Sequence, residues 1–383
     1  MLLKMNNIRI LGIAIAFCMA IPIFAQQYVA TLPYQMKGGK IIVNMQVNGT
    51  SRPFIFDTGG QTALLTDVCS EIGLTAIDSI PVTDVHNNTI FHKRTCIENL
   101  TTPDNVFNFN QVPTLMFDKV KGWDCFGAEG VIGSDLLQNF IVVIDSKKQT
   151  IYITSAEKSA KASLRKMRPF VKDGFMPIIN IQIASSTDLT VLFDTGCPSF
   201  LSMSDNDFFA LQQTAKMKVV CEAIKEGNIG STGQAKHTTS KRVHIPLLNV
   251  GSTKFNDLIT HTARHPYTLL GVKLLDYGVV TIDYSRHRLY FESFNQENVI
   301  ENRLHNFDLT VKNGDLYVST VWDNMKNKVH VGDKVVEIDG IPTRKFDFCE
   351  SIIYGISELK DKRQCKLTIQ TKNGLKKVVY KQE

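Results

Sequence analysis

Hydrophobic and polar residues alternate along much of this chain, a pattern that predicts half-buried β-strands rather than helices. The segment KIIVNMQVNGTSRPFIFD (40–57) alternates on both sides of Asn48-Gly49, which predicts a β-hairpin closed by a two-residue turn. The segment PIINIQIASSTDLTVLFD (177–194) follows the same course with a slightly longer turn. Each hairpin runs directly into the residues Phe-Asp-Thr-Gly, so the same local unit is predicted twice.

The repeat continues downstream of each hairpin. The segment VIGSDLLQNFIVVIDSKKQTIYI (131–153) aligns without a gap with LLGVKLLDYGVVTIDYSRHRLYF (269–291). In both, an apolar strand ends in a glycine, and a short helix and a closing hairpin are predicted to follow. A repeat of this length predicts two similar lobes, which we assign to residues 26–154 and 169–296. The residues between them, 155–168, are basic and poor in strand-forming side chains, and we interpret them as a linker.

A third unit is predicted at residues 300–383. Turn-forming Gly-Asp and Asp-Gly pairs flank an alternating strand in this part of the chain. A helix is predicted over residues 346–359, and a final hairpin follows it. This order of elements predicts a small α+β domain.

The N-terminal residues 1–25 have the layout of a secretory signal peptide. Lys4 and Arg9 precede an apolar stretch that ends before Ala25, and this stretch is shorter than a comfortable membrane span. We therefore expect an exported protein, periplasmic or secreted by a bacterium, with no stable membrane span in the mature chain. A single membrane anchor is the alternative interpretation of the same residues.

Composition excludes some partners. The net charge of +6, in a chain with 21% charged residues, is weak and scattered, so nucleic acid is not expected as a partner. Cys18 lies in the predicted signal peptide, and the other seven of the eight cysteines form no Cys-x-x-Cys pair. We therefore expect no metal and no other cofactor, and the disulfide pairing cannot be deduced from the sequence.

The two Phe-Asp-Thr-Gly segments place Asp57 and Asp194 at the ends of apolar strands. A glycine two residues after each aspartate lets the backbone approach closely and offer an N–H group to the carboxylate. If the two lobes bring these carboxylates together, like charges at short range must share one proton. The ionised partner can then accept a proton from water while the protonated partner polarises a carbonyl group, which is general acid–base hydrolysis of an amide.

These two segments, each followed downstream by an apolar-apolar-Gly triplet, resemble the motifs of aspartic proteases of the retropepsin and pepsin type. The resemblance covers nearly all of residues 28–294 and implies two pseudo-two-fold-related β-barrel lobes in a single duplicated chain. It implies a catalytic pair, Asp57 and Asp194, that activates water. It implies that other residues support this pair, namely Thr58, Gly59, Thr195, Gly196, Gly133 and Gly271. Hairpin flaps over the substrate are expected around His86, Asn87 and Asn88 in the first lobe and Gly230, Ser231, Thr232 and Gly233 in the second.

The C-terminal unit resembles a PDZ domain of the type found in bacterial proteases. The resemblance implies a groove between the strand 315–320 and the following helix, where an extended peptide adds as a further strand. A chain-terminal carboxylate is the implied ligand of the loop before this strand. The peptide-binding residues would then be Gly314, Asp315, Leu316, Tyr317 and Val318. The alternative is that this unit only braces the protease.

Together these features predict an exported aspartic endopeptidase that hydrolyses peptides or unfolded proteins with the Asp57/Asp194 pair, and whose PDZ domain binds or positions the substrate. Two alternatives stay open. One is a catalytically silent peptide-binding protein that uses the cleft between the lobes and the PDZ groove. The other is an enzyme whose aspartate pair forms between two chains.

Overall fold

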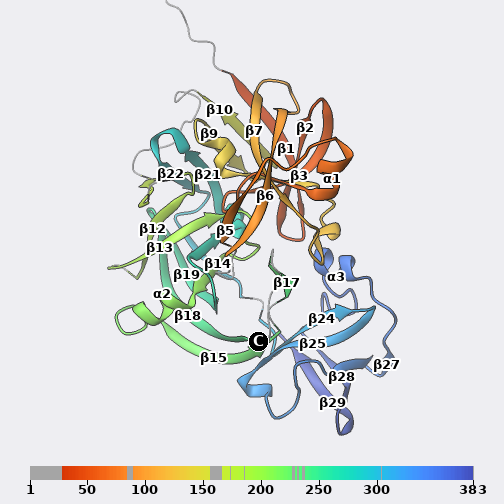
Figure 1. The fold of residues 1–383 in the computed structure, drawn as a ribbon. Coiled ribbons are helices and arrows are strands. Elements are labelled where there is room, and N and C mark those ends of the chain that lie inside the picture. Colours follow the sequence, from red (N-terminus) through yellow and green to blue (C-terminus); the bar gives the residue numbers. More distant parts are fainter. Residues whose placement is uncertain are drawn as a thin grey trace, which may run out of the picture.

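The computed structural model describes residues 28–83, 89–155, 166–172, 174–184, 186–226, 229–230, 233–234, 238–302 and 304–382. The predicted signal peptide lies outside these residues. Figure 1 shows two β-rich lobes and a smaller C-terminal unit, and the predicted mainly β fold is confirmed. Within the described part of the chain, no helix is both long enough and apolar enough to cross a membrane.

The first lobe is built around the hairpin that leads into the first Asp-Thr-Gly loop. In β2 (Lys40–Val47) every second side chain is buried, so one face of the strand covers the core. Asn48 and Gly49 both adopt positive φ in the turn to β3 (Thr50–Asp57), which is the two-residue turn that the sequence predicts. The other elements of this lobe are β1 (Val29–Lys37), β4 (Ala63–Leu65), α1 (Thr66–Glu71), β5 (Asp78–Thr83), β6 (Thr89–Thr101), β7 (Asn108–Phe117), η1 (Trp123–Cys125), β8 (Gly130–Gly133), η2 (Ser134–Leu137), β9 (Ile141–Asp145) and β10 (Thr150–Thr154).

The second lobe has the same strand pairings around its own Asp-Thr-Gly loop. β13 (Thr187–Asp194) runs parallel to β20 (Thr268–Gly271) with Asp194 opposite Gly271, just as β3 runs parallel to β8 with Asp57 opposite Gly133. The other elements of this lobe are β11 (Met167–Pro169), β12 (Ile178–Ile183), β14 (Leu201–Ser204), α2 (Asp205–Leu211), β15 (Lys218–Lys225), β16 (Ile229–Gly230), β17 (Gly233–Gln234), β18 (Thr238–Val250), β19 (Thr253–Ala263), η5 (Val272–Tyr277), β21 (Gly278–Asp283), η6 (Tyr284–Arg286), β22 (Arg288–Ser293) and β23 (Glu297–Val299). The segment predicted as a linker is not free of strands. Its last two residues belong to β11, which pairs with β22 at the edge of a sheet.

One sheet and one core join the two lobes. β9 of the first lobe pairs antiparallel with β21 of the second, with Ile144 opposite Val280. Buried apolar side chains from both lobes form a continuous cluster that includes Phe56 and Phe193. Because these two phenylalanines directly precede the aspartates, the shared core fixes the two Asp-Thr-Gly loops relative to one another.

The C-terminal unit has a hydrophobic core of its own, which includes Phe307, Val335 and Leu367. Its helix is shorter than the predicted one, because Gly355 takes a positive φ directly after Tyr354 and ends it. The elements of this unit are β24 (Phe307–Lys312), β25 (Asp315–Trp322), η7 (Asp323–Met325), β26 (Lys334–Ile338), β27 (Ile341–Pro342), α3 (Phe348–Tyr354), β28 (Gln364–Thr371) and β29 (Gly374–Lys381).

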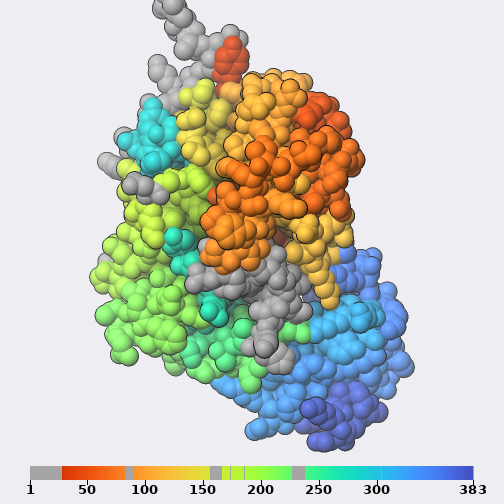
Figure 2. Space-filling view, in the orientation of Figure 1, coloured from red at the N-terminus to blue at the C-terminus, as the bar shows by residue number. Residues whose placement is uncertain are grey.

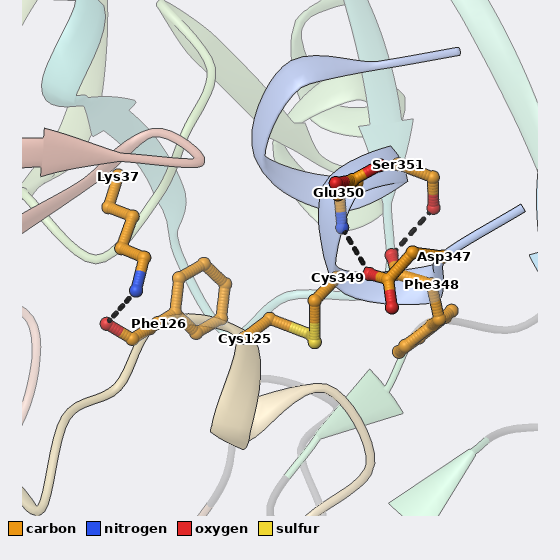
Figure 3. The surroundings of a disulfide bond; sticks show 8 residues. All are labelled: Lys37, Cys125, Phe126, Asp347, Phe348, Cys349, Glu350 and Ser351. Carbon is orange, nitrogen blue, oxygen red and sulfur yellow. Dashed lines mark hydrogen bonds between the residues drawn. A yellow bond between two sulfur atoms is a disulfide. The ribbon is translucent and has the colours of Figure 1, made fainter.

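The C-terminal unit is attached to both lobes, against which it packs in the space-filling view (Figure 2). β15 of the second lobe pairs antiparallel with β25, with Ala223 opposite Trp322, so the sheet continues from one unit into the other. A disulfide between Cys125 and Cys349 joins η1 of the first lobe to α3 (Figure 3). The sequence could not assign this pairing, because the two cysteines meet only through the packing of two separate units.

Reduction of the Cys125–Cys349 disulfide is expected to lower the free energy of unfolding by about 3 kcal/mol. The two cysteines are 224 residues apart, so the bond closes a long loop and restricts the unfolded chain. Thermal unfolding with and without a thiol reductant measures the difference. The reductant should have no further effect on Cys125→Ser, and an equal drop in that variant would show that the bond is not the source.

A buried arginine also fastens the C-terminal unit to the second lobe. Arg242 of β18 is 2% exposed, and its guanidinium carbon lies 3.8 Å from the ring centroid of Trp322 in β25. The same side chain donates a hydrogen bond from Nη2 to the carbonyl oxygen of His305 at 2.7 Å. Burial raises the pKa of Asp308 in β24, and the positive charge of Arg242 acts in the opposite direction. The arginine therefore interacts with a carbonyl group and a half-buried carboxyl group of the C-terminal unit.

Arg242→Met is expected to lower the free energy of unfolding by about 3 kcal/mol. The carbonyl group of His305 loses its hydrogen bond, Asp308 loses a nearby positive charge, and the contact of the guanidinium group with the ring of Trp322 is lost. Denaturant unfolding measures this loss. Arg344→Met is the matched control, since the ion pair of Arg344 with Glu358 lies at the surface of the same unit and contributes little. Equal stability of the two variants would contradict the role assigned to Arg242.

Candidate active site

Asp57 and Asp194 lie at the ends of the equivalent strands β3 and β13, and the two loops meet where the lobes join. Phe56 and Phe193, one residue earlier, have no exposed surface and anchor the strands in the core. The carboxyl groups of the two aspartates hydrogen bond to each other. The structure thus brings together, within one chain, the two aspartates that the sequence singles out.

The glycines of the two loops permit this approach. A β carbon on Gly59 would lie 2.6 Å from Cγ of Asp194, and one on Gly196 would lie 2.3 Å from Oδ2 of Asp57. Each glycine is therefore packed against the carboxyl group of the opposite lobe, where no side chain fits. The N–H of each glycine also binds its own aspartate, at 2.9 Å from Gly59 to Asp57 and 2.7 Å from Gly196 to Asp194. These bonds orient both carboxyl groups.

The two threonines bind each other's loops in a reciprocal arrangement. The N–H of Thr58 donates to Oγ1 of Thr195 at 3.0 Å, and the N–H of Thr195 donates to Oγ1 of Thr58 at 3.0 Å. Each hydroxyl group then donates to a carbonyl oxygen across the junction, from Thr58 to Phe193 at 2.6 Å and from Thr195 to Phe56 at 2.8 Å. Both threonines are fully buried, so these four bonds hold the aspartates in place without competition from water.

Gly133 and Gly271 brace the loops from the next strand. A β carbon on Gly133 would lie 2.6 Å from Cα of Gln61, and one on Gly271 would lie 2.2 Å from the carbonyl oxygen of Ser199. Both glycines therefore pack on the backbone that leaves each Asp-Thr-Gly loop.

Only one of the two carboxyl groups is deeply buried. Asp194 is 6% exposed, whereas Asp57 is half-buried. Burial raises the pKa of Asp194 well above its ordinary value, and the charge of Asp57 and the hydrogen bond to Asp57 raise it further. Lys40 and the N–H of Gly196 act in the opposite direction but are the smaller effects. The arrangement thus favours a single proton shared by the pair.

Cys197 directly follows the second Asp-Thr-Gly, and its thiol group lies near the pair. It is buried, and its pKa is raised to about 12, first by burial and then by the charge of Asp194. A thiol with such a pKa stays neutral and is a poor nucleophile. In the part of the chain that the structure describes, no group of three or more His, Cys, Asp or Glu side chains is arranged to hold a metal ion.

Three residues near the pair were missed by sequence reasoning. Ser134 donates from Oγ to the carbonyl oxygen of Thr58 at 2.7 Å, and its Oγ lies 2.6 Å from the hydroxyl oxygen of the buried Tyr284. Lys40 donates from Nζ to the carbonyl oxygen of Gly196. Ser134 could have been noticed because it directly follows Gly133, but neither Tyr284 nor Lys40 lies in a motif.

The predicted flap residues are mostly beyond what the structure describes. His86, Asn87, Asn88, Ser231 and Thr232 lie outside the described residues. The backbones of Gly230 in β16 and Gly233 in β17 pair with each other in a short hairpin. The strands β5 and β6 in the first lobe, and β15 and β18 in the second, form the antiparallel pairs that lead toward these segments.

The predicted peptide groove in the C-terminal unit is wrong in its position. The predicted residues Gly314, Asp315, Leu316, Tyr317 and Val318 form the start of β25 and the turn before it. β24 pairs along one edge of β25, and β26 and β15 occupy the other edge, so β25 has no free edge to which a peptide could add. Leu316 and Val318 are buried in the core, and Asp315 forms ion pairs with Lys334 and Lys345 at 2.8 and 2.9 Å.

The groove of the C-terminal unit lies one strand earlier, between β24 and α3. A cavity of about 390 Å³ is lined there by residues that include Asp308, Leu309 and Thr310 of β24 and Ile352 of α3. Among the described strands, only β25 pairs with β24, which leaves the opposite edge of β24 without a strand partner. From the sequence we predicted a groove beside the helix, but we placed it at β25, whereas the cavity lies beside β24.

Comparison of this chain with known proteins gives remote structural similarities. No family model matches the chain, and no curated protein matches it. The crystal structure of an aspartic proteinase from Irpex lacteus is similar to 70% of this chain and 98% of its own, with a TM-score of 0.44 and 13% identity. A retropepsin-like aspartic protease from Rickettsia conorii is similar to 34% of this chain and 93% of its own, with a TM-score of 0.25 and 14% identity.

Proposed function

We propose that this chain is an aspartic endopeptidase that hydrolyses peptide bonds with the Asp57/Asp194 pair. The observation that carries the proposal is the meeting of two carboxyl groups at a junction built for them, with reciprocal threonine bonds and a glycine behind each carboxyl. Both aspartates come from one chain, so no second chain is needed to complete the pair.

The mechanism uses the unequal burial of the two aspartates. Ionised Asp57 accepts a proton from a water molecule, whose oxygen attacks the carbonyl carbon of the scissile bond. Protonated Asp194 donates its proton to the carbonyl oxygen, which gives a neutral tetrahedral diol. The pair then donates a proton to the amide nitrogen and accepts one from a hydroxyl group of the diol as the C–N bond breaks. The amine and a carboxylic acid are released, and the pair is back in its one-proton state. No covalent enzyme intermediate forms.

A role for the C-terminal unit in binding the substrate is part of the proposal. An extended peptide can add as a strand to the outer edge of β24, with α3 on the other side. Titration with an extended peptide, followed by NMR, should shift the resonances of β24 and α3. Shifts confined to other elements would favour a unit that only braces the lobes.

Export of the protein is the remaining part of the proposal and rests on residues 1–25. Expression of the full chain in a bacterium, followed by mass measurement of the protein in the periplasm and medium, tests it. A protein that keeps residues 1–25 and is found in the cell membrane would favour the alternative of a single membrane anchor.

The proposed reaction is tested by incubating the purified protein with an unbiased peptide mixture in ¹⁸O-labelled water, from acid to neutral pH. New termini that carry one ¹⁸O atom in the carboxylate are the expected products. Binding of peptides without any cleavage would favour the alternative of a catalytically silent peptide-binding protein.

A further inference from the structure

Lys40 is a charged residue beside the aspartate pair. It belongs to the first lobe but contacts the Asp-Thr-Gly loop of the second lobe. It is the first residue of β2, directly after the turn Gly38-Gly39 of the hairpin β1–β2. Its Nζ donates a hydrogen bond to the carbonyl oxygen of Gly196, the glycine whose N–H binds Asp194. A lysine of the first lobe thus holds the Asp-Thr-Gly loop of the second.

The turn that carries this lysine is itself held by other parts of the chain. A β carbon on Gly39 would lie 2.7 Å from Cβ of Pro198, and one on Gly38 would lie 2.8 Å from Cδ1 of Ile353. Both glycines have positive φ, which permits a tight turn. The turn lies directly against the second lobe and α3, with no room for a side chain at either glycine. The disulfide of Figure 3 fixes α3 beside the turn. The position of the ammonium group is therefore defined by all three units.

Neither the neighbouring lysine nor the equivalent residue of the second lobe makes such a contact. Lys37, on the same turn, donates to the carbonyl oxygen of Phe126 at 3.0 Å, as Figure 3 shows. Met176 stands at the place of Lys40 in the second repeat and packs with apolar residues. The two repeats thus supply a cation to one loop only.

The charge of Lys40 acts on the groups that it faces. It lowers the pKa of Asp194 and the pKa of Cys197, in both cases against burial, which is the larger effect. The third group at this place is Asp57, which hydrogen bonds to Asp194. The side chains of α3 and of the second lobe that lie nearest to Gly38 and Gly39 are apolar, namely Ile353 and Pro198. The other charged groups on the turn and at the start of α3 are Lys37, Asp347 and Glu350.

We propose that Lys40 is a positioning residue for the aspartate pair: its ammonium group fixes the loop of Gly196 and places a positive charge beside Asp194. This inference rests on the proposed function, since it assigns Lys40 a role in that reaction. A cation beside the pair stabilises its ionised forms, so the pair holds one proton over a lower pH range than it would without the lysine. Lys40 thus offsets part of the upward shift that burial imposes.

The test compares Lys40→Met, Lys40→Gln and Lys40→Arg with the native protein. Met and Gln remove the charge, and Gln keeps a donor for the Gly196 carbonyl group. In both variants the pH profile of kcat/KM is expected to move to higher pH, so that kcat/KM falls about ten-fold at a fixed pH on the acidic side. Arg should restore the native profile. Lys37→Met is the matched control and should leave the profile in place.

A second measurement does not depend on turnover. ¹³C NMR of aspartate-labelled protein follows the carboxyl titration of the pair, identified by its loss in Asp194→Asn. This titration should move to higher pH in Lys40→Met and Lys40→Gln but not in Lys40→Arg. A native protein that cleaves nothing would contradict the proposed function, while the carboxyl titration would still decide the role of Lys40.

Unchanged carboxyl titration in Lys40→Met would overturn the inference, and so would a displaced titration in Lys40→Arg. Should Lys40→Met fail to fold, Lys40→Gln makes the same comparison with a retained hydrogen bond.

Discussion

The single variants Asp57→Asn and Asp194→Asn are each expected to lower kcat/KM about 10³-fold. The reaction needs one ionised and one protonated carboxyl group in contact, and an amide can neither accept the proton of water nor donate as an acid. Asparagine has almost the volume of aspartate and its oxygen can still accept the bond from Gly196 or Gly59. The loss should therefore appear in kcat without loss of the fold. Cleavage of the best peptide from the mixture measures it.

Asp207→Asn is the matched control for these two variants. Asp207 lies in the second lobe and accepts hydrogen bonds from the N–H and the hydroxyl group of Thr268, at 3.2 and 2.6 Å, away from the pair. Its kcat/KM should stay within a few-fold of the native value. Survival of activity in Asp57→Asn or Asp194→Asn would rule out the paired mechanism.

The variant Asp194→Asn is also expected to change how the stability of the protein depends on pH. The folded-state pKa of Asp194 is raised above its ordinary value of 3.8, so folding favours the protonated form. Its contribution to stability is fully present below the ordinary value and is lost as the pH rises through the folded-state pKa. Asn carries no titrating proton. The stability of Asp194→Asn relative to the native protein is therefore expected to increase as the pH rises above 3.8.

Gly196→Ala is expected to lower kcat/KM about 100-fold and to destabilise the protein by about 2 kcal/mol. Its β carbon would lie 2.3 Å from Oδ2 of Asp57, which is less than van der Waals contact, so the carboxyl group or the loop must move. Such a shift separates the two carboxyl groups and weakens the reciprocal threonine bonds. Peptide cleavage and denaturant unfolding measure the two effects.

Gly60→Ala, on the other loop, is a control with the same change in volume. Its β carbon would lie 3.2 Å from Cγ of Asp57, so a movement of a few tenths of an ångström accommodates it. Only a small loss of activity is expected. If Gly196→Ala were as active as Gly60→Ala, the close approach of Gly196 to Asp57 would not be needed for the reaction.

The binding-protein alternative makes the opposite set of predictions. A silent protein would bind peptides equally well with Asn at either position, because it needs neither proton transfer nor a shared proton. The deep burial of Asp194 argues against this alternative on physical grounds. Burying a carboxyl group next to another one destabilises the folded protein, and a structure built only for binding gains nothing from it.

The sequence predicted the local elements of this protein well. Alternation in residues 40–47 and the pair Asn48-Gly49 define a hairpin through interactions between neighbours, and the structure contains it. Asp57 and Asp194 could be singled out because the same four residues recur at the ends of two similar strands. The small helix and the groove beside it in the C-terminal unit were also expected, although the helix is shorter.

The sequence by itself thus determined the strands, the turns and the two aspartate loops, because these depend on side chains close together along the chain. Only the tertiary structure decided which elements meet. Alternation shows which face of a strand is buried but not which strand lies beside it, so the free edge of β24 was assigned to β25. The contact of Lys40 with Gly196 and the disulfide between Cys125 and Cys349 join separate lobes and units. Such contacts exist only after each lobe has formed its core and packed against the others.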